Sequence, residues 1–545
     1  MKELIHLDIE SITLSRKSNF MQDYLKQNED IMKFFEYKPL SNFKERLEYL
    51  KQKSFKREEL VKVLHKKNEE WGATEESLQN IQRLKDEEAL VVIGGQQAGL
   101  LSGPTYTVNK VISIIKLARQ QEEVLQVPVI PVFWIAGEDH DYEEINHTYL
   151  LTEQGMIKHQ INQHVQERTP VSDIKMDQAL SLKWIDELFL TLEETSYTKD
   201  LYKLIQNCLN HSHTYVDFFA RFINELFRNE GLVLIDSNDK EVRQLESNYF
   251  EEMILKQNEI SERIYRSTQL VRQSGYELTI EPELEDAHIF YHLEGERILL
   301  VRNDEDLWLG KQNEIELSTK ELLQIAKEQP EKLSNNVVTR PLMQDLLFPT
   351  LAFVGGWGEI SYWSVLKDAF ASMDLKMPPI VPRLSFTYVE PKVAKLVERY
   401  SLHYEEILSR GVGKERINWI SSQEAYPTKF VAEQIKEDID ELHKPLRKIA
   451  EDISPNLKEL SEANLYFIQE KLDYLLRSIE KEVAKKHKKN LVDFSDVEFS
   501  LFPNSQLQER IFNPCYLLNY FGGDFIHKMI GEDISFEQEH YLVFL

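Results

Sequence analysis

Residues 90–147 begin with LVVIGGQQAGLLSGPTYTVNK (90–110) and end with VPVIPVFWIAGEDHDYEEINH (127–147). Two short apolar runs, 90–93 and 129–135, are each followed within two residues by glycine and then by polar groups. Between them, apolar side chains recur at roughly helical spacing, at Val108, Ile112, Ile115 and Leu117. This pattern is typical of a strand, a crossover helix and a parallel strand. The segment therefore predicts an α/β fold with a parallel sheet.

The polar groups that follow the two apolar runs mark a candidate ligand site. In a strand-helix-strand unit, ligands bind past the carboxyl ends of the strands. That position is taken here by Gly94, Gly95, Gln96, Gln97, Gly99, Gly103, Glu138, Asp139, His140 and Asp141. We therefore expect ligand contacts from this set of residues.

Three further apolar runs extend the same pattern. GLVLID (231–236), LAFVGG (351–356) and IVPR (380–383) each predict a short buried strand. Glu359 follows the second run, and Arg383 ends the third. Several strand ends are thus expected to converge on one crevice of glycines, acids and arginines, which is better evidence for a site than any single motif.

The rest of the chain is divided by its composition and periodicity. Residues 1–88 are mostly helical in pattern and charged, and we expect a cap packed on a core that spans 89–384. Within that core, about 150–230 and 255–335 are expected to be insertions. The second insertion contains HIFYHLEGERILLVRND, which predicts a hairpin around Gly295.

Two long helices are predicted beyond the core. Apolar residues keep a three-four spacing from 431 to 449 and again from 457 to 483, with charges between them. Two such helices joined near Pro455 are expected to form an antiparallel coiled-coil hairpin within residues 385–500 and to mediate dimerisation. The aromatic-rich tail, 501–545, is too apolar for a free end and is expected to fold back on the core.

Composition limits the functional classes. The chain has 545 residues, of which 42% are hydrophobic, enough for two or three domains. Its net charge of −27 would repel nucleic acid, and the one Lys-rich run, 481–489, reads as a solvated helix end. Only two cysteines are present, which favours a reducing cytoplasm. No window approaches the roughly 20 apolar residues that a membrane span needs.

The glycine-rich segment after the first strand has two interpretations. It is neither a dinucleotide fingerprint nor a P-loop, because the glycine spacing differs and no Gly-Lys-Ser/Thr follows. Its backbone amides would approach a phosphate or carboxylate at the start of the next helix, helped by Gln96, Gln97 and Lys110. The alternative is a tight strand-to-helix turn without a ligand, with Lys110 facing solvent.

The segment EDHDYEEINH (138–147) leaves three interpretations open. Imidazoles and carboxylates suit zinc or manganese, but the spacing of seven between His140 and His147 is not a recognised ligand pair. Asp139 and His140 at a strand end would instead bind a substrate ammonium or hydroxyls, and His140 could move a proton near neutral pH. The third interpretation, a helix N-terminus favoured by acids, explains Glu143 and Glu144.

Three arginines lie in apolar or aromatic surroundings, namely Arg340, Arg383 and Arg510. A guanidinium held there is suited to bidentate recognition of a carboxylate or phosphate. The alternative for each is a structural ion pair. Cys208 and Cys515 have no adjacent base in the sequence, so neither is expected to act as a nucleophile.

Five segments together resemble one protein family. They are GGQQAGLLSGPTYTVNK, VFWIAGEDHDYEEINH, RPLMQDLLFPTLAFVGG, MPPIVPR and LFPNSQLQERIFN, in this order over nearly the whole chain. They are similar to the bacillithiol-biosynthesis cysteine-adding enzyme family, the cysteine ligases. The resemblance implies a Rossmann-like core akin to that of class I aminoacyl-tRNA synthetases, with two connecting insertions and a carboxyl-terminal coiled coil that dimerises.

The resemblance also implies a reaction. The carboxyl group of L-cysteine would be joined to the amine of glucosaminyl-malate to give bacillithiol, in a homodimer. Composition and charge, as given above, predict a cytoplasmic protein that binds neither nucleic acid nor membrane. Amide formation from a free carboxylate needs activation, for which ATP is expected, with magnesium screening the phosphates. The signature ATP-binding motifs of the synthetases are not found in this chain.

Roles for individual residues follow from that reaction. Gly94 to Gly103 with Gln96, Gln97 and Lys110 would bind an anionic part of nucleotide or substrate. Asp139 and His140 would orient the glucosamine hydroxyls or amine, with His140 as a candidate base, and Arg340, Arg383 and Arg510 would hold the malate carboxylates. Asp141 and Glu359 complete the expected binding set. Two other functions stay open: a binding scaffold for a thiol-biosynthesis complex, and a metal-dependent hydrolase that uses Asp139, His140 and Asp141.

Overall fold

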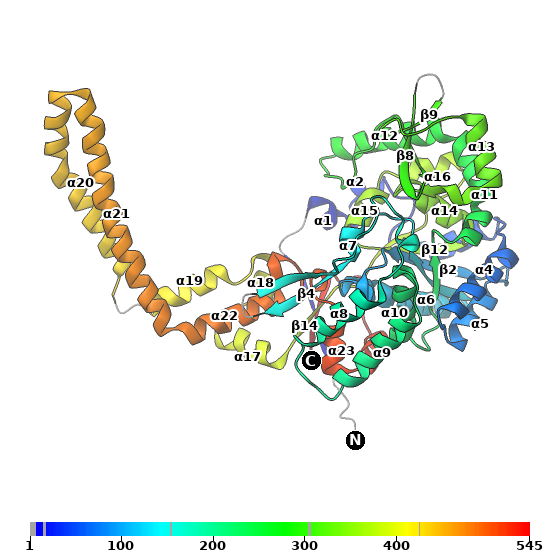
Figure 1. The fold of residues 1–545 in the computed structure, drawn as a ribbon, viewed down its shortest axis with the longest axis horizontal. Coiled ribbons are helices and arrows are strands. Elements are labelled where there is room, and N and C mark those ends of the chain that lie inside the picture. Colours follow the sequence, from blue (N-terminus) through cyan, green and yellow to red (C-terminus); the bar gives the residue numbers. More distant parts are fainter. Residues whose placement is uncertain (1–6, 15–17, 153–154, 304–306, 424–425) are drawn as a thin grey trace. The chain divides into compact units, whose positions relative to one another are not determined.

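A computed structural model describes residues 7–14, 18–152, 155–303, 307–423 and 426–545 (Figure 1). The described chain divides into two compact units. One comprises residues 7–388 and 506–543, and the other comprises residues 389–505 with 544–545. The first unit contains the predicted α/β core, and the second contains the long helices.

A parallel sheet of five strands lies in the first unit. Its order is β13-β12-β2-β3-β6, and all neighbouring strands are parallel. The strands are β2 (Leu90–Gln96), β3 (Val129–Ile135), β6 (Val233–Asp236), β12 (Thr350–Gly355) and β13 (Ile380–Pro382). Every strand residue except Gln96 is buried, which explains the unbroken apolar runs in the sequence. The predicted parallel core is confirmed.

Helices cover both faces of this sheet. Helix α6 (Tyr106–Leu125) crosses from β2 to β3 and packs on both strands. Leu60 and Ile81, from helices of the N-terminal segment, share a buried cluster with Val91. Because alternate strand residues point to opposite faces, β2 lies between two helical layers. The N-terminal helices are α1 (Asn19–Leu25), α2 (Glu29–Met32), α3 (Phe43–Leu50), α4 (Arg57–Glu70) and α5 (Glu75–Arg83).

A second sheet is antiparallel, in the order β10-β9-β8-β7-β11. Strands β7 (Asp286–Leu293) and β8 (Glu296–Arg302) form the hairpin predicted around Gly295, whose φ of +89° suits glycine. The further strands are β9 (Leu307–Gly310), β10 (Glu316–Ser318) and β11 (Leu333–Asn335), which the sequence did not predict. Trp308 belongs to the same buried cluster as the parallel sheet, so this region shares the core.

The remaining elements of this unit are one hairpin and a set of helices. The hairpin joins β4 (His147–Thr152) and β5 (Gly155–Gln160). The helices are α7 (Tyr142–Ile145), α8 (Gln178–Phe189), α9 (Thr198–Asn210), α10 (Tyr215–Leu226), α11 (Lys240–Leu255), α12 (Gln257–Gln273), α13 (Thr319–Glu328), α14 (Thr339–Leu347), α15 (Trp357–Trp363) and α16 (Lys367–Ser372).

The C-terminal tail closes the turn between β2 and α6. Thr105 donates its backbone N–H to the Phe512 carbonyl at 2.8 Å. Asn513 Nδ2 donates to the carbonyls of Leu101 and Gly103, at 3.1 and 3.0 Å. The tail contains α23 (Pro514–Phe521), α24 (Asp524–Gly531) and β15 (His540–Phe544), and β15 lies between β1 (Asp8–Ile12) and β14 (Phe386–Val389) in a third sheet.

The second unit is dominated by a helical hairpin. Helices α20 (Thr428–Ile453) and α21 (Pro455–Lys486) lie side by side (Figure 1), and the pairs Lys429–Glu480 and Lys436–Asp473 show that they are antiparallel. The predicted coiled-coil hairpin is confirmed. The unit also contains α17 (Pro391–Arg399), α18 (Tyr404–Arg410), α19 (Gly413–Ser422) and α22 (Lys488–Leu501). Among the described helices of the whole chain, none is long and apolar enough to cross a membrane.

Candidate active site

A cavity of about 700 Å³ opens at the carboxyl ends of β2, β3, β12 and β13. This is the edge at which α/β sheets bind ligands. The predicted site residues that line it are Gly95, Gln96, Gln97, Lys110, Glu138, Asp139, His140, Arg340, Glu359, Arg383 and Arg510. Gly94, Gly99, Gly103 and Asp141 lie outside its lining. The fold thus brings residues from distant parts of the sequence into one crevice.

The two glycines near the end of β2 are needed for sheet packing. A Cβ atom on Gly94 would lie 2.7 Å from the carbonyl oxygen of Val354, in β12. A Cβ atom on Gly95 would lie 2.6 Å from the carbonyl oxygen of Trp134, in β3. Real Cβ atoms do not approach oxygen so closely, so any larger residue would push neighbouring strands apart. Strand packing by itself accounts for this Gly-Gly pair.

The later glycines of the turn pack on each other. A Cβ atom on Gly99 would lie 2.9 Å from Gly103 Cα, and Gly103 has a φ of +69°. Their backbone amides donate within the turn, to the carbonyls of Gln97 and Leu100. The geometry therefore favours the tight-turn interpretation over the predicted anion-binding loop, because both glycine amides already have partners.

Lys110 is buried under the crevice and has no donor left for a ligand. Its ammonium donates to the Gly95 carbonyl at 2.6 Å, to Gln96 Oε1 at 3.0 Å and to Glu359 Oε2 at 2.5 Å. An ammonium has three donors, and all are used. Burial lowers the pKa of Lys110, and Glu359 opposes that shift. We therefore revise the binding roles predicted for Lys110 and Glu359: the pair joins α6 to the start of α15, where Glu359 also accepts the Gly356 N–H.

Arg383 is also committed to a partner within the chain. Its terminal nitrogens donate to the two carboxylate oxygens of Glu509 at 2.7 and 2.6 Å. Ser385 Oγ and Asn109 Nδ2 donate to the same carboxylate, at 2.8 and 2.9 Å. Burial alone would raise the pKa of Glu509, but Arg383 outweighs it and the pKa falls to about 2. The role predicted for Arg383 in holding malate is revised, because the carboxylate that it binds belongs to the C-terminal tail.

Arg340 and Arg510 keep free guanidinium donors in the crevice. Arg340 is buried, donates to the Tyr362 hydroxyl and stacks on Phe353 with its Cζ 5.6 Å from the ring centre. Arg510 is exposed. Within the part of the chain that the structure describes, neither forms an ion pair with a carboxylate, in contrast to Arg383. Such groups are suited to carboxylates or phosphates.

Acidic and imidazole groups from residues 138–144 line the same cavity. Asp139 accepts Gln97 Nε2 at 2.6 Å and the backbone N–H of His140 at 2.8 Å, so its carboxylate is held in one direction. Burial raises the pKa of Glu144, and a hydrogen bond from Gln97 opposes that rise. The side chain of His140 is 33% exposed, which leaves it accessible from the crevice.

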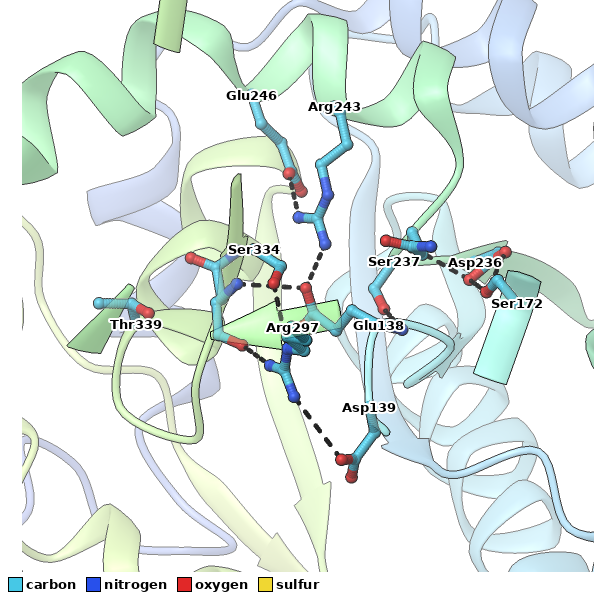
Figure 2. Close-up of polar contacts among 12 residues, drawn as sticks. Glu138, Asp139, Ser172, Asp236, Ser237, Arg243, Glu246, Arg297, Ser334 and Thr339 are labelled. Carbon is cyan, nitrogen blue, oxygen red and sulfur yellow. Dashed lines mark hydrogen bonds and ion pairs between the residues drawn. The ribbon is translucent and has the colours of Figure 1, made fainter. Parts of the chain in front are cut away.

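Arg297 is a crevice residue that sequence analysis missed. It comes from β8, and its Nη1 lies 3.2 Å from His140 Nδ1 and 3.6 Å from Asp139 Oδ1. Figure 2 shows Arg297 reaching Asp139. Its neighbours in the sequence, Glu296 and the apolar run 298–301, do not distinguish it from an exposed arginine beside a hairpin turn. Only the packing of the antiparallel sheet beside β3 brings it to the site.

Glu138 fastens the second sheet to the end of β3. Its carboxylate accepts the Asn335 N–H at 3.2 Å and pairs with Arg243, which also binds Glu246 at 2.6 Å (Figure 2). Burial raises the pKa of Glu246 to about 7, although Arg243 opposes the rise. A buried charge needs such a partner. Glu138 therefore supports the crevice wall and does not present a free carboxylate.

The glycine of the Gly-Glu-Asp-His run also has a packing role. A Cβ atom on Gly137 would lie 2.0 Å from Ser172 Oγ and 2.1 Å from an oxygen of Asp236. The Ser172 hydroxyl donates to the Asp236 carboxylate (Figure 2), and burial raises the pKa of Asp236 to about 7. Only glycine fits between β3 and this buried pair.

Within the described residues, the site has neither a metal-ligand cluster nor a reactive thiol. Among the residues that the structure describes, no three His, Cys, Asp or Glu side chains form a group that could hold a metal ion. Both cysteines are buried; burial raises the pKa of Cys208 to about 12 and also raises that of Cys515. A thiol of raised pKa is a poor nucleophile at neutral pH.

Comparison with known proteins gives matches over both parts of the chain. The family model "Bacillithiol biosynthesis BshC, N-terminal Rossmann-like domain" matches residues 7–384, and "Bacillithiol biosynthesis BshC, C-terminal coiled-coil domain" matches residues 386–545. The protein named "Putative cysteine ligase BshC" of Oceanobacillus iheyensis is 40% identical, over 98% of this chain and 99% of its own length. Proteins of the same name from Bacillus cereus strain AH187 and Bacillus anthracis are 39% identical, over 98% of this chain and 100% of theirs.

Gly95→Ala is expected to lower the melting temperature of the ligand-free protein, because the new methyl group overlaps the Trp134 carbonyl. Overpacking of this kind costs about 1–3 kcal/mol. Gly358→Ala is the control, since its Cβ would meet no atom within 4 Å. Differential scanning fluorimetry compares the two variants. An unchanged melting temperature for Gly95→Ala would contradict this packing role of Gly95.

Glu509→Gln is expected to destabilise the protein near neutral pH by about 3–5 kcal/mol, because it leaves Arg383 buried without a charge partner. The pKa of Glu509 is depressed to about 2 from a reference value of 4.5. Its stabilising contribution is therefore complete above about pH 4.5 and is lost as the pH falls towards 2. Thermal melts of both proteins from pH 7 to 3 should show a gap that narrows below pH 4.5; a constant gap would contradict this assignment.

Proposed function

The chain belongs to the BshC family of bacillithiol biosynthesis, and we propose that it is a carbon-nitrogen ligase acting in the last step of that pathway. It joins the carboxyl group of L-cysteine to the glucosamine amine of glucosaminyl-malate. Relatives that carry the cysteine ligase name along their full length support this proposal. The cytoplasm, predicted from the low cysteine content, stays the expected location.

The observation that carries the proposal is the charge distribution of the crevice. Arg340 and Arg510 offer unpaired guanidinium groups, while Asp139 and Glu144 offer carboxylates in the same cavity. Glucosaminyl-malate has two carboxylates on its malate part and an amine and hydroxyls on its sugar part. The arginines therefore suit the malate, and Asp139 with His140 suits the sugar amine and hydroxyls.

Cysteine must be activated before its carboxyl group can form an amide, and ATP with magnesium is the proposed co-substrate. ATP supplies a good leaving group on the carboxyl carbon, and magnesium screens its phosphates. The β2–α6 turn does not fit a phosphate, because its glycine amides and Lys110 have internal partners. Arg340 and Arg510 could hold phosphates, but the malate needs the same donors, so we assign them to malate.

In the ligation step, the role of the protein is to accept the proton that the attacking amine releases. The amine nitrogen attacks the activated carbonyl carbon, the C–N bond forms, and the bond to the leaving group breaks with its electron pair. The nitrogen loses one proton in this step. Asp139 is assigned as its acceptor, because Gln97 and the His140 N–H hold the carboxylate at the crevice.

The coiled-coil hairpin is proposed to join two copies of the chain. On its outer surface Leu442 and Phe467 are 81% and 63% exposed, and further exposed apolar residues follow at intervals of seven, at Ile449, Leu460 and Tyr474. A heptad seam that the hairpin does not bury is the pattern that a second coiled coil covers. We therefore retain the predicted homodimer.

The two other functions that the sequence left open are not favoured by a specific observation. A metal-dependent hydrolase needs a ligand cluster that the described residues do not form. A binding scaffold would need the crevice only for binding, and the reconstitution below separates it from an enzyme.

Reconstitution tests the proposed reaction directly. The purified full-length protein is incubated with L-cysteine, glucosaminyl-malate, ATP and magnesium, and with each component omitted in turn. Mass spectrometry is expected to detect bacillithiol only in the complete mixture, and release of AMP or ADP identifies how the carboxyl group is activated. No product in the complete mixture, with dimerisation intact, would favour the scaffold.

Arg510→Met is expected to raise the KM for glucosaminyl-malate about 10- to 100-fold, because a charge-assisted hydrogen bond to a malate carboxylate is lost. The KM for cysteine should stay close to that of the wild type. Arg228→Met, an exposed arginine outside the crevice lining, serves as the control. Equal effects of the two variants on the KM for glucosaminyl-malate would remove Arg510 from the site.

Combined Leu442→Glu and Phe467→Glu is expected to convert a dimer into a monomer, since charged side chains cannot be buried unpaired in an apolar seam. Light scattering after size-exclusion chromatography measures the mass. Lys471→Gln, an exposed polar position on α21, is the control and should stay dimeric. A monomeric wild type at micromolar concentration would refute the proposed dimer.

A further inference from the structure

Arg297 is a buried arginine whose guanidinium is fixed by hydrogen bonds and by stacking on an aromatic ring. Its Nε donates to Ser334 Oγ at 3.1 Å, and its Nη2 donates to the Asn335 carbonyl. The ring of Phe290 lies beneath it, with 3.8 Å between the Arg297 Cζ and the ring centre. The remaining terminal nitrogen, Nη1, points to His140 Nδ1 at 3.2 Å. This arginine therefore presents one N–H to the imidazole from a fixed position.

The contact with Arg297 decides where His140 carries its proton. A guanidinium has only donors, so in this hydrogen bond Nδ1 of His140 must accept. A neutral imidazole has one N–H, which is then on Nε2. No residue of the described chain accepts a hydrogen bond from Nε2, and the side chain is 33% exposed at the crevice. The imidazole thus offers the substrate an N–H group.

We propose that Arg297 fixes His140 as a hydrogen-bond donor, through Nε2–H, to an oxygen of the reacting carbonyl group, and that His140 is not the base that deprotonates the amine. The inference rests on the proposed ligase function and assigns a role within that same site. His140 would be the catalytic residue, because it touches the reacting atoms. Arg297 is a positioning residue that acts through it.

The charges around the imidazole agree with a neutral form. Burial lowers the pKa of His140, and Arg297 from β8 lowers it further, as does Arg168. Asp139 and Asp141, from the same segment as His140, act in the opposite direction but do not prevail. His292 of β7 also interacts with His140, and its own pKa is lowered to about 3, so it is neutral. The imidazole is therefore uncharged at neutral pH.

This assignment gives the two side chains separate roles in the ligation step: His140 stabilises the carbonyl oxygen, and Asp139 accepts the proton of the amine. As the amine attacks, the carbonyl oxygen gains negative charge, which a fixed N–H stabilises by an amount worth about 100- to 1,000-fold in rate. The proton that leaves the nitrogen goes to Asp139, as proposed above. His140 neither gains nor loses a proton over the cycle.

Substitution by glutamine separates a donor from a base. The Nε2 amide of His140→Gln lies near the position of the imidazole Nε2 and still donates, but an amide cannot take up a proton near neutral pH. His140→Ala provides neither function. We expect the glutamine variant to keep at least about a tenth of the wild-type kcat and the alanine variant to lose about 100-fold or more. Equal losses in both variants would overturn the proposal.

The tautomer of His140 supplies a second readout that a merely structural role of Arg297 would not move. With Arg297→Met, Nδ1 of His140 loses the donor that makes it accept, so nitrogen NMR of histidine-labelled protein should show that the neutral ring no longer carries its proton on Nε2 alone. His211→Gln, at an exposed histidine, is the control and should leave the His140 signals unchanged. An unchanged Nε2–H tautomer in a folded Arg297→Met protein would contradict the proposal.

The same assays distinguish failure of this inference from failure of the proposed function. If the wild-type protein makes bacillithiol but the glutamine and alanine variants are equally impaired, only the role of His140 is refuted. If the wild-type protein makes no product in the complete mixture, the ligase function is refuted and the donor assignment falls with it. Melting temperatures of all variants establish that each is folded.

Discussion

Burying a charge is unfavourable by several kcal/mol unless a partner is buried with it, and this constraint shapes the crevice. Three internal ion pairs surround it, namely Lys110 with Glu359, Arg383 with Glu509, and Arg243 with Glu138. Each pair joins elements that are far apart in the sequence, so the crevice walls are held by electrostatic contacts as well as by packing. Arg340 and Arg510 differ from these cations, since their charges remain for a ligand.

The candidate site is assembled from three parts of one unit. The parallel sheet contributes Asp139 and His140 at the end of β3, the antiparallel sheet contributes Arg297, and the C-terminal tail contributes Arg510. The tail is anchored by Glu509, the neighbour of Arg510, so the ion pair with Arg383 also places a free guanidinium in the crevice. Stability of the tail and substrate binding are therefore linked through adjacent residues.

The sequence predicted the fold class because buried strands and helices each have a recognisable pattern of apolar residues. Strands buried on both faces read as unbroken apolar runs, and all five such runs are strands of one parallel sheet. The helical hairpin was predictable for the same reason, from three-four spacing. The antiparallel sheet was only partly predicted: its hairpin had a turn glycine, but β9, β10 and β11 are short and lie in charged surroundings where no period is visible.

By itself, the sequence determined the order of the elements, the edge of the sheet where the site lies, and most of the charged residues that line it, since these depend on local periodicity and on the direction of parallel strands. Only the tertiary structure decided what each of those residues does. The glycines before α6 serve strand packing, Lys110 and Arg383 have internal partners, and Arg297 sets the proton position on His140. Such roles depend on which charges and backbone atoms meet across long stretches of chain, and no local pattern records those contacts.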